Sequence, residues 1–223
     1  MSHTLETVLF DLDGTLCEYE RPSSEALSAA FDRIGREPLF EMEDFYARYT
    51  EFLRESESGV ELFERTFTAL ARDLGEEPEL GGELARAFCA EREPWAVRPV
   101  EGASSVVEAL ASEYRIGLVT NGHPDIQRRK LDRIGLADAF ETQVFAGYET
   151  AAKPDPEPFR RALADLDATP TGAVYVGDIP QVDVPGAQAA GLRAAWMRSD
   201  RPLGDAEPDY VLDSLAALRT PPW

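Results

Sequence analysis

The stretch VLFDLDGTL, residues 8–16, decides the fold of this chain of 223 residues. Its apolar run at residues 8–10 shows no alternation, which is typical of a parallel strand buried on both faces. The run ends in Asp11 and Asp13, and Gly14 lets the backbone turn away without a Cβ clash. Functional groups of open parallel sheets lie beyond the carboxyl ends of the strands. The stretch therefore predicts a buried first strand with two carboxylates at a functional edge.

Two carboxylates this close suggest a particular chemistry. They repel each other unless a cation lies between them, and Mg²⁺ commonly binds between carboxylates and a substrate phosphate. An aspartate can also attack phosphorus and form an aspartyl-phosphate, while a second aspartate acts as general acid and base. Asp and Gly equally favour a plain strand-end turn, so this stretch alone leaves a structural role open.

The charge of the chain excludes two classes of partner. It has 22 basic and 42 acidic residues, a net charge of −20. Such a chain is repelled by nucleic-acid phosphates and by anionic membrane surfaces, so we expect neither as a partner. Lys130 and Lys153 are its lysines, and every other basic residue is arginine. An acidic surface poor in lysine is typical of a protein from a high-salt cytoplasm; a GC-rich genome, which favours Arg over Lys, is the alternative.

The remaining composition indicates a soluble protein, long enough for one α/β domain with a sizeable insertion or for two small domains. Apolar residues make up 43% of the chain, enough for a sizeable core. The two cysteines form no disulfide framework. No apolar run approaches the roughly 18 residues of a membrane span, and no signal peptide opens the sequence. We expect a cytoplasmic protein, and its oligomeric state stays open at this stage.

A helical region interrupts the chain after the first motif. From about residue 23 to residue 93 the apolar spacing is helical and no strand pattern occurs. Such a series predicts a small helical bundle inserted into the main domain. The first helix has Ser23 or Ser24 as a capping residue, and the four helices are marked by apolar residues in the segments 27–34, 45–53, 60–74 and 84–88.

Strands and helices then alternate to the end of the chain, which predicts an α/β fold with a doubly wound parallel sheet. The predicted strands are residues 116–119, 143–145, 173–176, 193–197 and 210–212, and the predicted helices are residues 101–113, 124–134, 157–166 and 183–190.

Three of the predicted strands end in polar groups of related chemistry. The first ends in the two aspartates described above, and the second ends in Thr120 and Asn121. The third ends in Asp178, with Asp183 five residues later. The carboxyl ends of parallel strands share one edge, and Lys153 opens a helix that could bring a cation to it. The sequence thus predicts one site built from all of these residues.

Phosphoryl transfer gives each group a role. Asp11 attacks phosphorus in line, and Asp13 protonates the leaving oxygen and then activates water. Thr120 donates a hydrogen bond to a phosphoryl oxygen, assisted by backbone N–H groups at residues 12 and 121. Lys153 offsets the negative charge. Mg²⁺ binds Asp11, Asp178 and the carbonyl of Asp13, with Asp183 as a further ligand or a residue behind the ligands.

The order of the motifs resembles one family. DLDGTL (11–16), TNG (120–122), KP (153–154) and GDIPQVDVPGAQAAG (177–191) match, in order, the four motifs of the haloacid dehalogenase-like hydrolases. The resemblance implies a Rossmann-like core, Mg²⁺, and Asp11 as the covalent nucleophile of a phosphatase acting on a small phosphorylated metabolite. It also implies a helical, C1-type cap over residues 17–97, inserted into a core formed by residues 1–16 and 98–223.

Single residues distinguish between the different reactions that members of this family catalyse. Dehalogenases have no acid at the second acidic position, where this chain has Asp13. Phosphonoacetaldehyde hydrolases use a cap lysine, and this cap contains none. Two alternatives to a phosphatase stay open. One is a non-catalytic binding protein on the same fold. The other is a phosphoglucomutase-type enzyme, whose second phosphate site could be supplied by the cap arginines Arg33, Arg36, Arg48 or Arg54.

Three further residues are interpreted as structural. Lys130 occurs among arginines on a helix, and we interpret that helix face as solvated. Cys17 is interpreted as a small buried hydrophobe rather than a reactive thiol. His123 follows the second predicted strand and is assigned no role.

Overall fold

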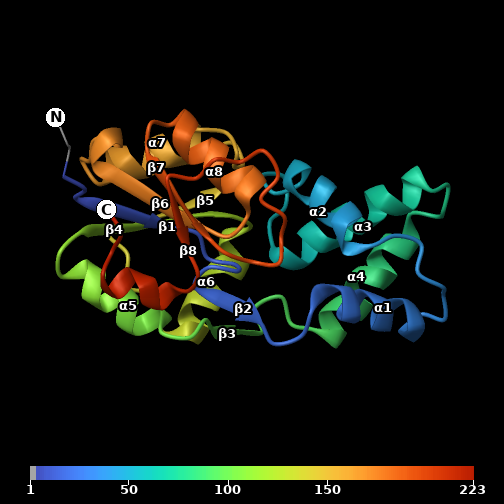
Figure 1. Ribbon diagram of the computed structural model, residues 1–223. Helices are drawn as coiled ribbons and strands as arrows, with labels where there is room; N and C mark the ends of the chain where they lie inside the picture. The colour runs from blue at the N-terminus through green and yellow to red at the C-terminus, as the bar shows by residue number, and fades with distance from the viewer. Residues whose placement is uncertain (1–3) are drawn as a thin grey trace.

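The computed structural model describes residues 4–223 and has a parallel sheet at its centre (Figure 1). The strand order is β5-β4-β1-β6-β7-β8, and every neighbouring pair is parallel. The predicted doubly wound parallel fold is therefore confirmed. The strands are β1 (Thr7–Phe10), β4 (Arg115–Asn121), β5 (Thr142–Ala146), β6 (Ala173–Gly177), β7 (Arg193–Met197) and β8 (Tyr210–Leu212).

The order of the strands explains where the site forms. From β1 the chain crosses to β4 and β5 on one side, and then returns to β6, β7 and β8 on the other. The crossing direction reverses beside β1, and a crevice opens at such a point beyond the carboxyl ends of the strands. Asp11 is the first residue after β1 and so lies at this crevice.

The strand residues face two separate apolar cores. Val8 and Phe10 belong to one core and Leu9 to the other, as the alternation of side chains along a strand requires. The first core is covered by α5 (Ala103–Ala111), α6 (Pro124–Ile134) and the 3₁₀ helix η3 (Leu215–Arg219), and the second by α7 (Glu157–Asp165) and α8 (Pro180–Ala189). A short 3₁₀ turn, η2 (Pro170–Gly172), leads into β6.

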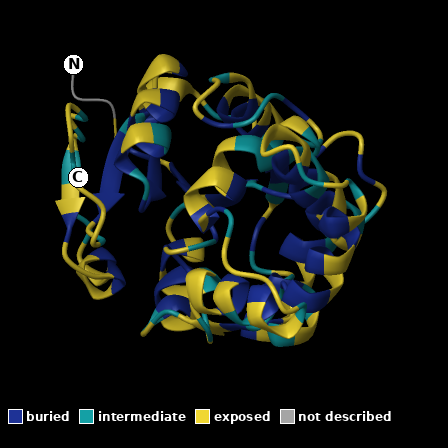
Figure 2. Cartoon of the chain, turned by 90° about the vertical axis from the view of Figure 1, so that its right-hand side faces the viewer, coloured by how far each residue is buried: buried dark blue, intermediate teal, exposed yellow. Residues whose placement is uncertain are grey.

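The inserted helices form a unit at one end of the sheet, at the right of Figure 1. Their buried faces turn inward around phenylalanine rings, and Figure 2 shows the exposed residues on the outside. A two-stranded antiparallel ribbon, β2 (Cys17–Tyr19) with β3 (Val97–Pro99), connects this unit to the sheet. The helices are α1 (Ser23–Arg33), α2 (Met42–Arg48), η1 (Tyr49–Glu51), α3 (Gly59–Asp73) and α4 (Glu79–Glu91).

The structure corrects two local predictions and adds one element. The second cap helix ends at Arg48 and continues as a 3₁₀ turn. Leu53, predicted on that helix, instead packs against Gly147 of the core. Ser23 does not cap α1, whose N-cap is Pro22 without a side-chain hydrogen bond. The ribbon β2–β3 was not predicted, since strands of three residues carry too little pattern.

The division of the chain into a core (1–16 and 98–223) and a cap (17–97) stays a proposal. Within residues 4–223, no helix is both long enough and apolar enough to cross a membrane.

Candidate active site

Three carboxylates meet at the crevice beside β1. Asp11 follows β1, Asp178 follows β6, and Asp183 lies in the first turn of α8. One oxygen from each lies within 4.8 Å of the others, and all three residues are buried. The structure thus brings together three groups that are far apart in the sequence.

The backbone must approach closely for these carboxylates to meet. A Cβ on Gly14 would lie 2.4 Å from a carboxylate oxygen of Asp178, and Gly14 also has a φ of +78°. A Cβ on Gly177 would lie 2.4 Å from a carboxylate oxygen of Asp183. Any larger residue at either position would displace an acid of the cluster. The glycines of the first and fourth motifs therefore make room for its carboxylates.

Lys153 supplies the positive charge of this cluster. Its Nζ lies 3.0 Å from Oδ1 of Asp11 and 2.9 Å from Oδ1 of Asp183. It also lies 2.6 Å from the hydroxyl of Tyr175, which in turn donates to the carbonyl of Val119. Although burial opposes its ionisation, the two carboxylates raise the pKa of Lys153, so this lysine is charged.

One ammonium does not neutralise three carboxylates. Burial raises the pKa of Asp11 to about 6, opposed by Lys153 and reinforced by Asp183. Burial also raises the pKa of Asp178 to about 8, reinforced by the charges of Asp11 and Asp183. The Oδ1 atom of Asp178 is buried without a hydrogen-bond partner. An unpartnered carboxylate oxygen beside two other acids fits the ligand set of a hard divalent cation.

Asp13 lies in a second cluster, beside the first. The Nζ atom of Lys130 is 2.8 Å from both of its carboxylate oxygens, and Gln127 donates to its Oδ2 at 2.9 Å. Burial opposes ionisation, but this ion pair lowers the pKa of Asp13. The interpretation of Lys130 as part of a solvated face is wrong, because its side chain is only 3% exposed.

Thr120 and Asn121 have different surroundings, although they are adjacent. The hydroxyl of Thr120 is buried and accepts a hydrogen bond of 2.8 Å from Gln127, which leaves its own hydrogen free for another acceptor. The side chain of Asn121 accepts from the N–H of Lys153 at 2.8 Å and donates to its carbonyl at 3.0 Å. Asn121 thus fixes the backbone that carries the lysine of the first cluster.

The cap touches the edge of the sheet near these residues. The hydroxyl of Tyr49 lies 3.5 Å from the carbonyl of Asn121. The ring of His123, assigned no role from sequence, accepts from the backbone of Asp125 at the start of α6. Its Nε2 lies 3.1 Å from the carbonyl of Ser56 in the cap. His123 therefore joins the cap to the core.

Cys17 is buried, and burial raises the pKa of its thiol. Its burial in the first core agrees with the prediction, and its sulfur also lies 3.9 Å from Oδ1 of Asp13.

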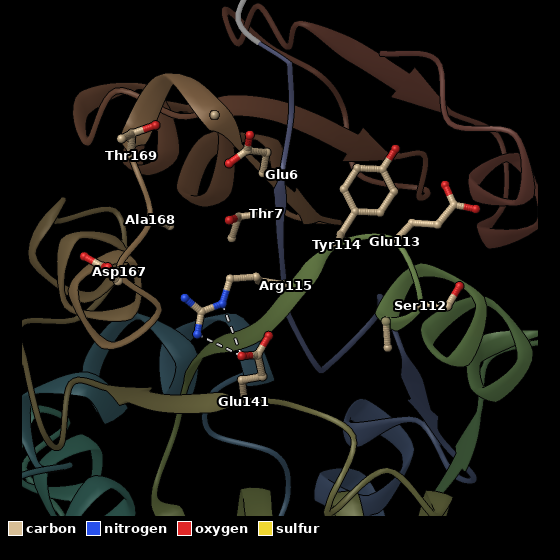
Figure 3. A pocket seen from close by; sticks show the side chains of 12 residues that line it. Glu6, Thr7, Ser112, Glu113, Tyr114, Arg115, Glu141, Asp167, Ala168 and Thr169 are labelled. Atoms are coloured by element: carbon tan, nitrogen blue, oxygen red, sulfur yellow. Dashed lines mark hydrogen bonds and ion pairs between the residues drawn. The ribbon is translucent and has the colours of Figure 1, made fainter.

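A separate hollow opens at the opposite end of the strands (Figure 3). It lies beside Thr7 and Arg115, where β1 and β4 begin. Arg115 is paired with Glu141 at 2.9 Å, so its charge is already satisfied. Active sites of open α/β sheets lie at the carboxyl ends of the strands, and we assign no chemistry to this hollow.

Comparison with known proteins extends these observations. The family model of the haloacid dehalogenase-like hydrolases matches residues 5–191. A phosphoserine phosphatase from Thermus thermophilus is 35% identical, over 94% of this chain and 94% of its own. A phosphoglycolate phosphatase from Cereibacter sphaeroides is 36% identical, over 84% of this chain and 83% of its own.

A solved structure of similar fold was determined with magnesium bound. The HAD-hydrolase YfnB from Bacillus subtilis, solved bound to magnesium, is 25% identical with a TM-score of 0.67. The match covers 96% of this chain and 97% of that one. In this chain, the geometry of the three carboxylates fits a divalent metal ion.

Proposed function

We propose that this chain, which belongs to the haloacid dehalogenase-like hydrolase family and is one of its phosphatases, hydrolyses a small phosphomonoester through a phosphorylated Asp11. The observation that carries this proposal is the buried cluster of Asp11, Asp178, Asp183 and Lys153. Relatives named for phosphoserine, phosphoglycolate and glyceraldehyde 3-phosphate support a small metabolite as substrate.

Mg²⁺ is the proposed cofactor. Asp11 and Asp178 supply carboxylate ligands, because Asp178 has an oxygen without any other partner. The backbone carbonyl of Asp13 is the third proposed protein ligand. Both oxygens of Asp183 already accept hydrogen bonds, from Lys153 and from the N–H of Ile179, so its main role is to orient the cluster. The bound ion would supply charge stabilisation to the transferring phosphoryl group.

Asp11 is the proposed nucleophile. A carboxylate oxygen of Asp11 forms a bond to phosphorus while the bond from phosphorus to the leaving oxygen breaks. Lys153 lies 3.0 Å from Asp11 and keeps it ionised against the effect of burial. The same ammonium offsets the charge that the phosphoryl group brings to the site.

Asp13 is the proposed general acid and base. It passes a proton to the leaving oxygen in the first step and takes one from the attacking water in the second. Lys130 and Gln127 hold its carboxylate. They act through Asp13 and are therefore positioning residues. The ion pair with Lys130 favours the ionised form of Asp13, which is the form that activates water in the second step. In the first step Asp13 must carry a proton before it can give it to the leaving oxygen, and the ion pair opposes that protonation.

Thr120, Asn121 and Lys153 are the proposed phosphate-binding residues. Because the Thr120 hydroxyl accepts from Gln127, its hydrogen can point to a phosphoryl oxygen. The side chain of Asn121 is occupied by the backbone of Lys153, so its contribution is its backbone N–H. A closed cap would exclude bulk water until the phosphorylated intermediate has formed.

The cellular setting is part of the proposal. The net charge of −20 supports a protein that works in a high-salt cytoplasm and binds neither nucleic acid nor membranes. None of the four arginines considered for a second phosphate site favours the mutase alternative. Arg33, Arg36 and Arg48 are paired with acidic residues on the surface of the cap, and Arg54 is exposed.

The test is hydrolysis of a panel of phosphomonoesters in molar KCl, with Mg²⁺ or with a chelator. Asp11→Asn is the control, since it keeps the shape of the side chain and removes the nucleophilic charge. We expect phosphate release that needs Mg²⁺ and is lost in this variant, together with a phosphorylated Asp11 trapped in the wild type. Undiminished turnover by Asp11→Asn would exclude the covalent route.

A further inference from the structure

Arg92 differs from every other arginine of the chain in being buried. Its exposure is 5%, and no other arginine of residues 4–223 falls in the buried class. It is the first residue after α4 and has an extended backbone, so it stands where the cap returns toward the core. A charged side chain is rarely buried unless it is paired, and its partner therefore needs to be identified.

No carboxylate within the described chain is paired with Arg92. The neighbouring Glu91 is engaged by Arg21 and Arg33, each at 3.0 Å. The hydrogen bond of Arg92 goes to the hydroxyl of Ser23, from Nη1 at 3.0 Å. Its Nε is buried and has no acceptor. The charge of Arg92 helps to lower the pKa of Asp13, but that carboxylate is paired with Lys130. The protein thus holds a desolvated guanidinium without an anion at contact distance, which is unfavourable unless an anion completes it.

Aromatic rings fix the guanidinium in place. Its carbon lies 3.9 Å from the centre of the Tyr19 ring and 5.2 Å from that of Phe88. Such stacking attracts a cation and keeps the planar group in one orientation. The rings provide no anionic acceptor for the N–H groups of Arg92. They therefore hold the guanidinium in position but do not neutralise its charge.

Arg92 is connected to the general acid through two residues. The hydroxyl of Tyr19 lies 2.8 Å from Nζ of Lys130, and that Nζ lies 2.8 Å from each carboxylate oxygen of Asp13. Because Asp13 must reach the leaving oxygen to protonate it, the alcohol part of the substrate lies on the Asp13 side of the phosphate. Arg92 is near Asp13, since its charge helps to lower the pKa of that carboxyl.

Hydroxyl groups of the cap surround the same place. Ser23 lies 2.9 Å from the hydroxyl of Tyr46, and the hydroxyl of Tyr49 reaches the edge of the sheet at Asn121. These groups come from α1, α2 and η1, which the ribbon β2–β3 holds above the site.

We propose that Arg92 binds a second anionic group, carried by the alcohol part of the substrate. The natural substrate is then a small phosphomonoester that bears a carboxylate or a second phosphate in addition to the ester that is hydrolysed. This inference rests on the proposed function, since it requires a phosphoester to be bound at Asp11 and Asp13. It adds the class of the leaving group and the residue that selects it.

The test compares substrates that differ only in the second anion. 3-Phosphoglycerate against glycerol 3-phosphate and phosphoserine against phosphoethanolamine isolate the carboxylate. Fructose 1,6-bisphosphate against fructose 1-phosphate isolates the second phosphate. We expect the wild type to prefer the anionic member of at least one pair by about 10- to 100-fold in kcat/KM, as for a hydrogen bond between charged groups. The preferred pair identifies the anion.

Variants of Arg92 assign that preference. Arg92→Met should lose about 10- to 100-fold with the anionic member and change the neutral member little. Arg92→Lys, which keeps the charge, should recover part of the difference. Arg86→Met is the matched control, since Arg86 lies on α4 and is exposed. Melting temperatures of all variants report whether they fold.

The outcomes separate this inference from the function on which it rests. A wild type that hydrolyses the esters without preferring the anionic members would overturn the role of Arg92 and leave the phosphatase intact. Equal losses for both members of each pair in Arg92→Met would assign it a purely structural role. Absence of hydrolysis of every ester, p-nitrophenyl phosphate included, would instead contradict the proposed function. The wild-type comparison needs no variant, so failure of Arg92→Met to fold leaves the inference testable.

Discussion

Lys130 lies with its ammonium nitrogen 2.8 Å from both carboxylate oxygens of Asp13. This symmetric contact favours the ionised form of Asp13, the form in which it acts as the proposed general base. Tyr19 joins the same ammonium from the ribbon that leads into the cap. Lys130 therefore contacts both Asp13 and Tyr19, which lies on the ribbon between the cap and the core.

Replacing Lys130 by Met should impair the second half of the reaction. Without the cation, burial would raise the pKa of Asp13, and its carboxylate would activate water less well at acidic pH. p-Nitrophenyl phosphate needs little protonation of its leaving group, so its hydrolysis reports the water-activation step. We expect the acidic limb of its pH profile to move to higher pH, with a loss of about 10²-fold or more below the new midpoint.

Two further variants make this prediction specific. Lys130→Arg keeps the charge and should keep the limb closer to that of the wild type. Arg129→Met removes an exposed cation from the same helix and should leave the profile unchanged. A uniform loss at all pH values in Lys130→Met would show that Lys130 acts on folding alone.

Replacing Lys153 by Met should reduce kcat by about 10²- to 10³-fold, the effect of removing a preorganised electrostatic group. The reason is that Asp11 and Asp183 share its ammonium at 3.0 and 2.9 Å. Steady-state kinetics with saturating Mg²⁺ measure the loss. Arg161→Met, which removes an exposed cation from α7, is the control. A change confined to KM would indicate that Lys153 contributes to binding only.

The metal-free protein should lose stability as the pH rises from about 4 to about 8. Asp11 and Asp178 have pKa values of about 6 and about 8 against an ordinary value of 3.8. The unfolded chain therefore releases these protons at lower pH than the folded chain does, and ionisation destabilises the fold. The lowered pKa of Asp13 acts in the opposite direction, but only below its ordinary value, and the raised pKa of Lys153 acts only above 10.5.

Mg²⁺ should reverse this trend, because it binds the ionised carboxylates. Melting temperatures measured with a chelator and with Mg²⁺ should diverge as the pH rises, by several degrees at neutral pH. In Asp178→Asn the difference should shrink and the metal-free protein should melt at a higher temperature than the wild type. A gap between the two curves that does not depend on pH would contradict this account of the cluster.

The parallel sheet and part of the site could be predicted from the sequence, because buried strands have a recognisable apolar pattern and the functional residues directly follow them. The apolar run before Asp11 and the alternation of strands and helices after residue 99 were sufficient to predict the parallel sheet. Convergence of Asp11 and Asp178 follows from that sheet, since β1 and β6 are neighbours. Such a prediction needs only the end of each strand, and not the side-chain positions.

The interpretation of Lys130 as solvent-exposed was wrong, although its position in the helical pattern indicates burial. It shares a face of α6 with buried residues at positions 126, 127, 131 and 134, which follow the period of a helix. Its arginine neighbours obscured that stripe. For Arg92 no periodic pattern exists, because it lies beyond the end of α4. Its burial depends on how the cap folds back on the core, which is a tertiary property.

The high net charge predicts that salt stabilises the fold. At −20 the folded chain repels itself, and molar salt reduces the screening length to about 3 Å. We expect the melting temperature to rise steeply between dilute buffer and molar KCl. Sucrose at equal water activity is the control for effects that do not depend on charge.

A charge variant separates repulsion from general salt effects. Glu83, Glu108 and Glu113 are exposed and take part in none of the ion pairs among residues 4–223. Changing all three to Gln removes negative charge without breaking a contact of that kind. The triple variant should melt at a higher temperature than the wild type in dilute buffer and at the same temperature in molar KCl, because screening already removes the repulsion there. A wild type that is fully stable in dilute buffer, with no gain from salt, would exclude adaptation to a high-salt cytoplasm.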